Sequence, residues 1–405
     1  MNIGFMRFVD YWLGVPLTIF ATVMVRLWDQ LRAQVNLSER QRVLFIELTE
    51  MGSAILADPA MRKVASHHDI YFVIFKRNVS SLGLLSTVPP GHVFTIREDS
   101  FWVLTMDTLR FLWWCRRQRI SAVIDLELFS RFTATLSGLS GARLRIGFCL
   151  PRSEGLFRGG LFTHPVAYNA RIHIARNFIA LTEPLLDHVT YRDPLIRRVI
   201  ADHEVELATV RPSEESQQRV KTLLGQKHPV VTQGYRMVLV NINAGDFLPQ
   251  RKWPPGHFSR FILTVLEQHS DVLILMTGSP AERPAVEKVA GEVNSPRCVN
   301  IAGDIAFEDL PALYALSEML LTNDSGPAHF ASTVGLRTYT LFGPETPLLY
   351  GPLGNSVAIY AGLACSPCVH VGNHRDTPCT DNQCLKQISP DEVYQLMRQD
   401  LARAH

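Results

Sequence analysis

Short runs of β-branched and aromatic residues alternate along the chain with longer segments in which apolar positions recur every three or four residues. In the first half the runs that predict strands lie at 42–48, 70–76, 92–96 and 121–128. A helical pattern fills 100–118, and another follows the polar turn "TEMGS", with Ser53 as its natural N-cap. Strands that alternate with helices of this size predict βαβ units and a parallel sheet.

The second half repeats this alternation after a polar stretch from about 185 to 235, which holds a helix between charged ends. Strands are predicted at 237–243, 271–278, 298–301, 319–323 and 338–343, with helices at 256–269, 281–291 and 308–317. The pattern therefore predicts an α/β protein with two Rossmann-like halves. The predicted divisions are an N-terminal segment 1–40, a first domain 41–200, a linker helix region 201–235 and a second domain 236–405.

The N-terminal segment is apolar. The stretch from Tyr11 to Val25 carries no charge, and Arg26, Arg32, Arg40 and Arg42 follow it. It is shorter than the about 20 residues that cross a bilayer. A helix that is apolar nearly all round and ends in arginines suits a membrane surface, while a buried helix packed on the first domain is the alternative. No small-residue cleavage site of a signal peptide follows the segment.

Composition excludes some function classes. The 405 residues are 47% hydrophobic and 19% charged, which is a globular composition. A net charge of +2, without a recognised nucleic-acid module, argues against a nucleic-acid partner, and the arginine cluster at 116–119 is typical of a solvated face. Seven cysteines, an odd number, favour a reducing compartment and an intracellular protein.

Polar turns that end the predicted strands are the candidates for chemistry, because open α/β sheets bind ligands at the carboxyl ends of their strands. In "TNDSGPAHFAS" the strand ends at Asp324, and Ser325 and Gly326 open the next helix. Backbone amides and the positive end of that helix suit a phosphate, and His329 lies one turn further along. A simple capping turn is the alternative.

Three motifs of the second half resemble glycosyltransferase family 9, the heptosyltransferases that build the inner core of lipopolysaccharide. The family's K-x-W-P, D-[ST]-G-x-x-H and F-G-x-T-x-P motifs correspond to residues 251–254, 324–329 and 342–347. In the first half, "RVLFIELTEMGS", the segment Asp125 to Arg131 and "RIGF" at 145–148 resemble further family segments, so that the resemblance spans about residues 40 to 395. It implies the GT-B fold: two Rossmann-like domains that face each other across a cleft, with the acceptor on the first and the nucleotide sugar on the second.

The resemblance also implies an inverting sugar transfer that requires no metal or cofactor for catalysis. Arg251, Lys252 and the amides of Ser325 and Gly326 would stabilise the leaving diphosphate. Asp324 and His329 belong to the same nucleotide-sugar turn, and Glu282 is a candidate for the nucleoside ribose. ADP-heptose is the donor that the family suggests.

The chain departs from the family at the proposed catalytic base. The family aspartate after Met-Gly is here Ser53, whose hydroxyl cannot accept a proton at neutral pH without a partner base. Glu50, three residues earlier in the same turn, is the candidate base, and a solvated loop carboxylate is its alternative reading. The family lysine falls on Arg251, which keeps the charge but changes its geometry.

The implied acceptor is an anionic, lipid-linked saccharide. Arg131, Arg143 and Arg145 are candidate contacts to it, with surface solvation as the alternative for each. An acceptor of this kind, together with the apolar N-terminus, places the protein at the cytoplasmic face of the bacterial inner membrane, peripheral or anchored by its N-terminus.

Four cysteines gather in the C-terminal tail: Cys365, Cys368, Cys379 and Cys384. They could form a structural zinc site, with His370 or His374 in place of one thiolate, or remain reduced and pack against the protein. Two other functions stay open beside the transferase. A catalytically silent relative could act as a sugar-nucleotide or glycan-binding scaffold, and a GT-B epimerase would act without an acceptor.

Overall fold

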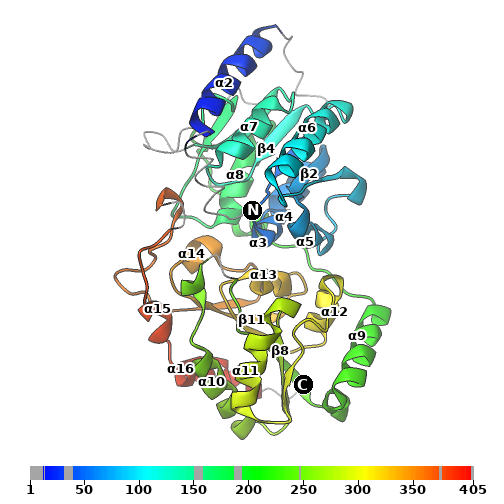
Figure 1. Ribbon diagram of the computed structural model, residues 1–405, viewed down its shortest axis with the longest axis vertical. Coiled ribbons are helices and arrows are strands. Elements are labelled where there is room, and N and C mark those ends of the chain that lie inside the picture. The colour runs from blue at the N-terminus through cyan, green and yellow to red at the C-terminus, as the bar shows by residue number, and fades with distance from the viewer. Residues whose placement is uncertain are drawn as a thin grey trace. The chain divides into compact units, whose positions relative to one another are not determined.

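The structure is a computed structural model that describes Trp12 and residues 14–31, 40–149, 158–186, 194–245, 248–373 and 376–402. Within these ranges the chain forms two compact units, Met1–Glu206 and Leu207–His405 (Figure 1). His374 and most of the segment before residue 14 lie outside the described residues. Each unit is described by itself below.

The first unit is built on a six-stranded parallel sheet in the order β3-β2-β1-β4-β5-β6. Its strands are β1 (Arg42–Ile46), β2 (Asp69–Phe75), β3 (Val93–Ile96), β4 (Ala122–Asp125), β5 (Leu144–Cys149) and β6 (His164–Ala167). The four predicted strands are confirmed as β1 to β4. Their runs are apolar almost throughout because helices cover both faces of a parallel sheet.

The helices of the first unit are α2 (Gly14–Gln30), α3 (Met51–Leu56), α4 (Asp58–Ala65), α5 (Ser80–Gly83), α6 (Phe101–Arg117), α7 (Arg131–Leu139) and α8 (Ile174–Leu186). The predicted helix at 100–118 is confirmed as α6, whose N-cap Ser100 accepts a hydrogen bond from the amide of Val103. The predicted N-cap Ser53 is wrong, because α3 begins at Met51 and its N-cap is Glu50. Ser53 lies inside that helix.

Helix α2 packs on α7 through a narrow face of small residues, in which Thr18, Ala21 and Val25 are buried. Its acid Asp29 forms an ion pair of 2.6 Å with Arg145 of β5. No helix in the described ranges combines the length and the apolarity that a membrane-spanning segment requires.

The second unit contains a second six-stranded parallel sheet, in the order β12-β11-β10-β7-β8-β9. Its strands are β7 (Arg236–Asn241), β8 (Val272–Thr277), β9 (Cys298–Asn300), β10 (Met319–Asn323), β11 (Arg337–Phe342) and β12 (Ser356–Tyr360). The five strands predicted for this half are confirmed as β7 to β11.

The helices of the second unit are α9 (Glu214–Lys227), α10 (Pro255–Gln268), α11 (Arg283–Val293), α12 (Leu310–Ala315), α13 (Gly326–Ser332), α14 (Pro347–Tyr350), α15 (Gln383–Lys386) and α16 (Pro390–Ala402). Two short 3₁₀ turns, η5 (Pro249–Arg251) and η6 (Pro280–Glu282), follow β7 and β8. The helices predicted at 256–269, 281–291 and 308–317 are confirmed as α10, α11 and α12.

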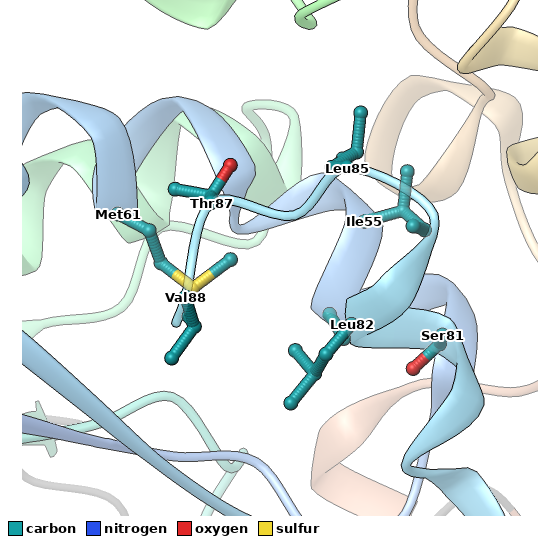
Figure 2. A pocket seen from close by; sticks show the side chains of 8 residues that line it. Ile55, Met61, Ser81, Leu82, Leu85, Thr87 and Val88 are labelled. Carbon is teal, nitrogen blue, oxygen red and sulfur yellow. The ribbon is translucent and has the colours of Figure 1, made fainter. Parts of the chain in front are cut away.

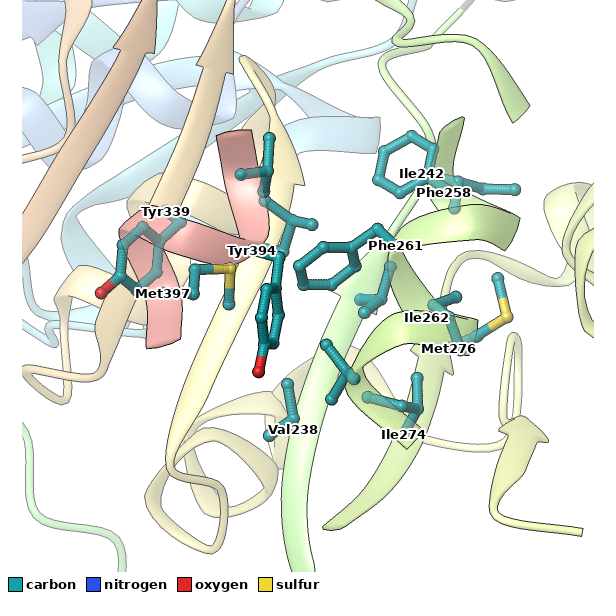
Figure 3. Packing of buried hydrophobic residues seen from close by; sticks show 14 of the residues in the cluster. Val238, Ile242, Phe258, Phe261, Ile262, Ile274, Met276, Tyr339, Tyr394 and Met397 are labelled. Atoms are coloured by element: carbon teal, nitrogen blue, oxygen red, sulfur yellow. The ribbon is translucent and has the colours of Figure 1, made fainter. Parts of the chain in front are cut away.

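The main core of the second unit lies between its sheet and the helices α10, α11 and α16. Phe261 of α10, Tyr394 and Met397 of α16 and Val238 of β7 belong to one buried cluster (Figure 3). Burial of such side chains contributes about 1.5–3 kcal/mol each, so this cluster fixes the strands whose ends carry the functional turns.

A small pocket in the first unit lies beside α3 (Figure 2). Its lining residues are Ala54, Ile55, Met61, Ser81, Leu82, Leu85, Thr87 and Val88. The lining is apolar apart from two hydroxyls, and the Ser81 hydroxyl already donates to the carbonyl of Asn78 at 2.8 Å. The pocket therefore lacks the charged groups that a sugar or phosphate site needs.

Candidate functional site

The strand order of the second unit creates a switch point between β7 and β10. From β7 the chain proceeds to β8 and β9 on one side, and β10 to β12 extend the sheet on the other. Loops that leave neighbouring strands in opposite directions open a crevice at the carboxyl edge of the sheet, where ligands of α/β proteins bind. The turns with Arg251 and Asp324 follow β7 and β10 at this point.

The loop after β7 is held in place by Trp253 and Asn323. The Asn323 side chain accepts from the Trp253 amide at 2.9 Å and donates to the carbonyl of Ile242 at 2.9 Å. Trp253 is buried, and its indole N–H donates to the carbonyl of Ile388 at 2.9 Å. The tryptophan of the K-x-W-P-like motif therefore anchors the two residues before it.

Arg251 faces two buried carboxyl groups. Its Nη1 lies 3.9 Å from Oδ2 of Asp324 and 4.0 Å from Oε2 of Glu345, and its Nη2 donates to the carbonyl of Ala244 at 3.3 Å. The separations to the carboxylates exceed those of direct charge-assisted hydrogen bonds, which are about 2.7–2.9 Å. The guanidinium therefore stands near both acids without a close bond to either.

The buried side chains of Asp324 and Glu345 interact with each other, and each shifts the pKa of its neighbour. Burial raises the pKa of Glu345 to about 8, and the neighbouring Asp324 charge adds to the shift. Burial also raises the pKa of Asp324, while Arg251 and the interaction with Glu345 oppose that shift. Two adjacent buried carboxyls cannot both ionise at low cost, so Glu345 holds the proton near neutral pH.

Glu345 is not among the site residues predicted from the sequence, although it lies in the "FGPETP" turn. Its position after β11, next to β10, brings it to Asp324. The signal that could have found it is an acidic residue in a turn that ends a buried strand.

The turn after Asp324 opens α13. Ser325 is the N-cap, but its side chain makes no capping hydrogen bond and instead donates to the carbonyl of Asn323 at 3.2 Å. A Cβ at Gly326 would lie 2.8 Å from the ring of Phe330, so the glycine is required for packing as well as for any close ligand. His329 is buried within the same helix.

Glu282 ends η6, at the same edge of the sheet after β8. One of its carboxylate oxygens accepts from the amide of Ser279 at 2.7 Å, which closes a capping box. The structure gives no contact between Glu282 and the Arg251 group, so its role toward a ribose stays a prediction. Lys252 is partly exposed beside Arg251.

The first unit has a corresponding switch point between β1 and β4. The turn after β1 carries Glu50 and Ser53, and the structure brings the two together: the Ser53 hydroxyl donates to Oε2 of Glu50 at 3.2 Å. The serine therefore orients the carboxylate that is the candidate base. Both residues are partly exposed, as a group that receives an acceptor proton must be.

Buried polar side chains clamp the turn that carries Glu50. Oε1 of Glu127 accepts from the amides of Leu48 and Thr49 at 3.0 and 3.1 Å. Oε1 of Glu47 accepts from the amide of Glu50 at 3.3 Å. The side-chain amide of Asn78 in turn donates to the carbonyls of Leu48 and Thr49 at 2.9 and 3.0 Å.

Glu127 lies two residues beyond the end of β4. It is not among the site residues predicted from the sequence, because the pattern at 121–128 is interpreted there as one strand. Burial raises its pKa, and the amide bonds from the turn oppose the shift. Burial also raises the pKa of Asp125 to about 7, against the opposing charge of Arg158. The acids around the turn of Glu50 therefore include one, Asp125, that titrates near neutral pH.

The three arginines proposed for the acceptor differ in exposure. Arg145 is only 2% exposed, and it donates to the carbonyls of Leu161 and Ala142 at 2.7 Å besides its ion pair with Asp29. Arg131 is buried at the start of α7, and Arg143 is partly exposed. The geometry gives Arg145 a structural role, as the residue that ties α2 to the sheet, and acceptor binding by the three stays a prediction.

The tail cysteines do not form a metal site in the described residues, where no group of three or more histidine, cysteine or acidic side chains converges. All seven cysteines are free thiols. Cys384 is buried against Gly343, and burial raises its pKa to about 11, which keeps it a neutral thiol. The thiols of Cys365, Cys368 and Cys379 lie near enough to add to that shift, and a structural zinc site on the four cysteines stays a prediction.

The match that decides the family covers more than half of the chain. Residues 132–377 match the model of glycosyltransferase family 9 (heptosyltransferase). The chain belongs to glycosyltransferase family 9. The resemblance read from the sequence motifs is thereby confirmed.

Curated relatives of this family 9 protein include lipooligosaccharide heptosyltransferase 2 of Campylobacter jejuni subsp. jejuni serotype O:2, which is 24% identical over 184 residues, 44% of this chain and 56% of the relative. Lipopolysaccharide heptosyltransferase 2 of Salmonella typhimurium is 26% identical over 151 residues, 36% of this chain and 42% of the relative. The matched segments thus span about half the length of these proteins.

The fold of this family 9 protein agrees with that of solved heptosyltransferases. The structure of the Escherichia coli ADP-heptose lps heptosyltransferase II superposes with a TM-score of 0.67 at 18% identity, over 89% of this chain and 98% of that chain. Two Rossmann-like domains of the GT-B type are therefore established. The family match includes Arg251, Asp324 and Glu345, whereas Glu50 and Ser53 lie before it.

Proposed function

We propose that the protein is an inverting glycosyltransferase that moves a sugar from a nucleoside diphosphate to a lipopolysaccharide core or a related lipid-linked glycan. The single observation that carries the proposal is Arg251, held by the Trp253 anchor at 3.9 Å from Asp324 and 4.0 Å from Glu345. A cation fixed at a switch point beside two buried carboxyl groups is a receptor for an anionic ligand with hydroxyl groups. The family's heptosyltransferases support heptose as the sugar, with ADP-heptose as donor.

In the proposed reaction, the oxygen of an acceptor hydroxyl forms a bond to the anomeric carbon while the bond from that carbon to the diphosphate breaks. The diphosphate leaves with the electron pair, and Arg251, Lys252 and the amides of Ser325 and Gly326 stabilise its charge. Charge-assisted hydrogen bonds contribute roughly 1.5–3 kcal/mol each. No resident metal is needed for this role, since the chain supplies cations of its own.

Glu50 takes the acceptor proton in this scheme. Its carboxylate is partly exposed and accepts a hydrogen bond from the Ser53 hydroxyl at 3.2 Å. The turn that carries it is fixed by Glu127, which accepts from the amides of Leu48 and Thr49. A base on a fixed turn can be held at the position that proton transfer requires. The serine at the position of the family aspartate thus keeps a supporting contact to the acid that replaces it.

Because the acceptor is lipid-linked in this proposal, we place the protein at the cytoplasmic face of the inner membrane as a peripheral protein. The support is α2, which buries small residues and leaves large ones exposed: Trp12 just before it, Leu17, Ile19, Phe20, Val23, Met24, Leu27 and Trp28 along it, and Leu31 after it.

A second function, a sugar-nucleotide-binding scaffold without turnover, is favoured by one observation, the absence of the family aspartate at Ser53. It would retain the Arg251 site and bind nucleotide, but it would transfer nothing.

The test is the release of nucleoside diphosphate from a panel of ADP-, UDP-, GDP- and TDP-sugars with truncated lipopolysaccharide as acceptor. Wild type should release one nucleotide in an acceptor-dependent manner, and Glu50→Gln should lower kcat by about 10²–10⁴-fold, the usual contribution of a general base. Glu267→Gln, an exposed glutamate of α10, serves as the matched control and should leave kcat unchanged.

Release that survives Glu50→Gln would keep the transferase and exclude this base. Nucleotide binding without release from any donor would instead favour the scaffold.

A further inference from the structure

Helix α6 carries a second exposed apolar face, separate from α2. Trp102, Met106, Leu109 and Trp113 recur at helical spacing on the side opposite the buried residues Phe111 and Cys115. Trp102 is 76% exposed and Trp113 61%. We call these four residues the outer face of α6. Single exposed apolar residues are ordinary, but a row of them with two tryptophans marks a binding surface.

Arginines gather around the C-terminal half of the outer face of α6. Arg110, Arg116 and Arg117 are exposed on the helix, and Arg119 follows its end. The guanidinium of Arg117 lies 5.3 Å from the ring centre of Trp113. The one acid of the helix, Asp107, is turned inward, where Arg97 lowers its pKa to about 2 and pairs with it at 2.8 Å. Asp107 also pairs with Arg110 at 3.2 Å, so the exposed surface of α6 combines tryptophans with the positive charges of Arg116, Arg117 and Arg119.

Helices α2 and α6 belong to the same layer of the first unit. Both contact α7, which lies between them in Figure 1. The exposed apolar residues of α2 and the outer face of α6 therefore flank one central helix, each with arginine at its border.

We infer that the outer face of α6 is a docking surface for the headgroup region of an anionic bilayer, and that it acts together with α2. Tryptophan favours the interface between water and hydrocarbon, and arginines flanking an apolar face bind anionic headgroups. A helix of this length lies in the plane of the interface rather than across it. A second copy of the chain is a poorer occupant, since a symmetric contact would bring the two arginine borders together.

The inference deepens the proposed function, on which its purpose rests: it gives the enzyme a fixed orientation at the surface that holds its acceptor. The measurement that decides it, vesicle binding, needs neither donor nor turnover, so the two can fail separately. The full chain is sedimented with vesicles of phosphatidylcholine alone and with vesicles that also contain phosphatidylglycerol as the anionic lipid.

Wild type should partition onto the anionic vesicles, and Trp102→Gln with Trp113→Gln should weaken that partitioning at least about tenfold. Leu396→Gln, which changes an exposed apolar residue on α16 of the second unit, should have no effect. Release of nucleotide with a deacylated, soluble acceptor should be the same in all three proteins. Thermal unfolding checks that each is folded.

A second pair of substitutions tests the electrostatic part. Arg117→Gln with Arg119→Gln should reduce the salt dependence of binding while keeping attachment at low salt. Equal vesicle binding by wild type and the double tryptophan variant would overturn the inference. So would a wild-type dimer that the tryptophan substitutions dissociate without changing vesicle binding, because the occupant would then be a second copy.

Discussion

The two switch points of the molecule hold buried carboxyl groups in opposite ways. In the first unit, Glu127 and Glu47 accept hydrogen bonds from the amides of the turn after β1. In the second unit, Asp324 and Glu345 face Arg251 across 3.9 and 4.0 Å. The first pair of acids is hydrogen-bonded to backbone amides. The second pair lies near the Arg251 guanidinium without a close bond to it.

This difference separates a positioning role from a binding role. In the first unit, Glu127 and Glu47 accept hydrogen bonds from backbone amides and thereby fix the turn that carries Glu50. Acids that leave a guanidinium at a distance keep its charge available, and the proton on Glu345 reduces the negative charge that a diphosphate would meet. The same residue types at equivalent places in two similar sheets thus serve different steps.

Removal of Arg251 should have the largest effect on catalysis, because it deletes the cation at the switch point between β7 and β10. Arg251→Ala should lower kcat/KM for nucleotide release by about 10²–10³-fold, comparable to the loss of one preorganised charge-stabilising donor. The measurement is steady-state nucleoside diphosphate release at saturating acceptor.

Arg260→Ala is the matched control, since Arg260 is an exposed arginine of α10, and it should keep wild-type kinetics. Arg251→Lys should give a kcat/KM between those of Arg251→Ala and wild type, because lysine restores the charge without the planar guanidinium. Equal kinetics of Arg251→Ala and wild type would remove Arg251 from the donor site.

The proton on Glu345 predicts a pH dependence of donor binding. As pH rises through about 8, Glu345 ionises and places a second negative charge beside the diphosphate, so affinity should fall. The fall approaches about tenfold per pH unit above that pKa if only the protonated form binds. Calorimetric titration of nucleoside diphosphate between pH 6.5 and 9.5, a range of about 1.5 units on each side of this pKa, measures it.

Glu345→Gln cannot ionise and should flatten the profile over this range. Glu318→Gln, which removes a partly exposed carboxyl paired with Arg236 away from the site, should leave the profile of wild type. An unchanged slope in Glu345→Gln would assign the titration to another group.

The turns of both switch points could be predicted from the sequence, because each buried strand ends at a polar cluster that is visible in the pattern. Glu127 and Glu345 could not, since their partners are set by which strands become neighbours: β4 beside β1, and β11 beside β10. Arg145 was a candidate contact to the acceptor, and nothing in the sequence indicates that Asp29, more than a hundred residues earlier, is its ion-pair partner. Strands β5, β6 and β12 were missed because an arginine, a proline and an alternating edge pattern interrupt their apolar runs.

Substitution of Glu127, which positions the turn of Glu50, should have the smallest effect on turnover. Glu127→Gln keeps an oxygen that accepts from the amides of Leu48 and Thr49, so the turn should stay in place and kcat should fall only about threefold, far less than an ångström-scale displacement would cost. Glu127→Ala leaves the buried amide of Leu48 without an acceptor, whereas the amide of Thr49 keeps Oε1 of Glu47 at 3.3 Å, and it should lower the free energy of unfolding by about 1–3 kcal/mol. Urea unfolding and kcat, measured for both variants, separate position from charge. If the charge of Glu127 mattered rather than its hydrogen bonds, the glutamine variant would lose as much activity as the alanine variant while unfolding like wild type, and Glu127 would join Glu50 in the chemistry.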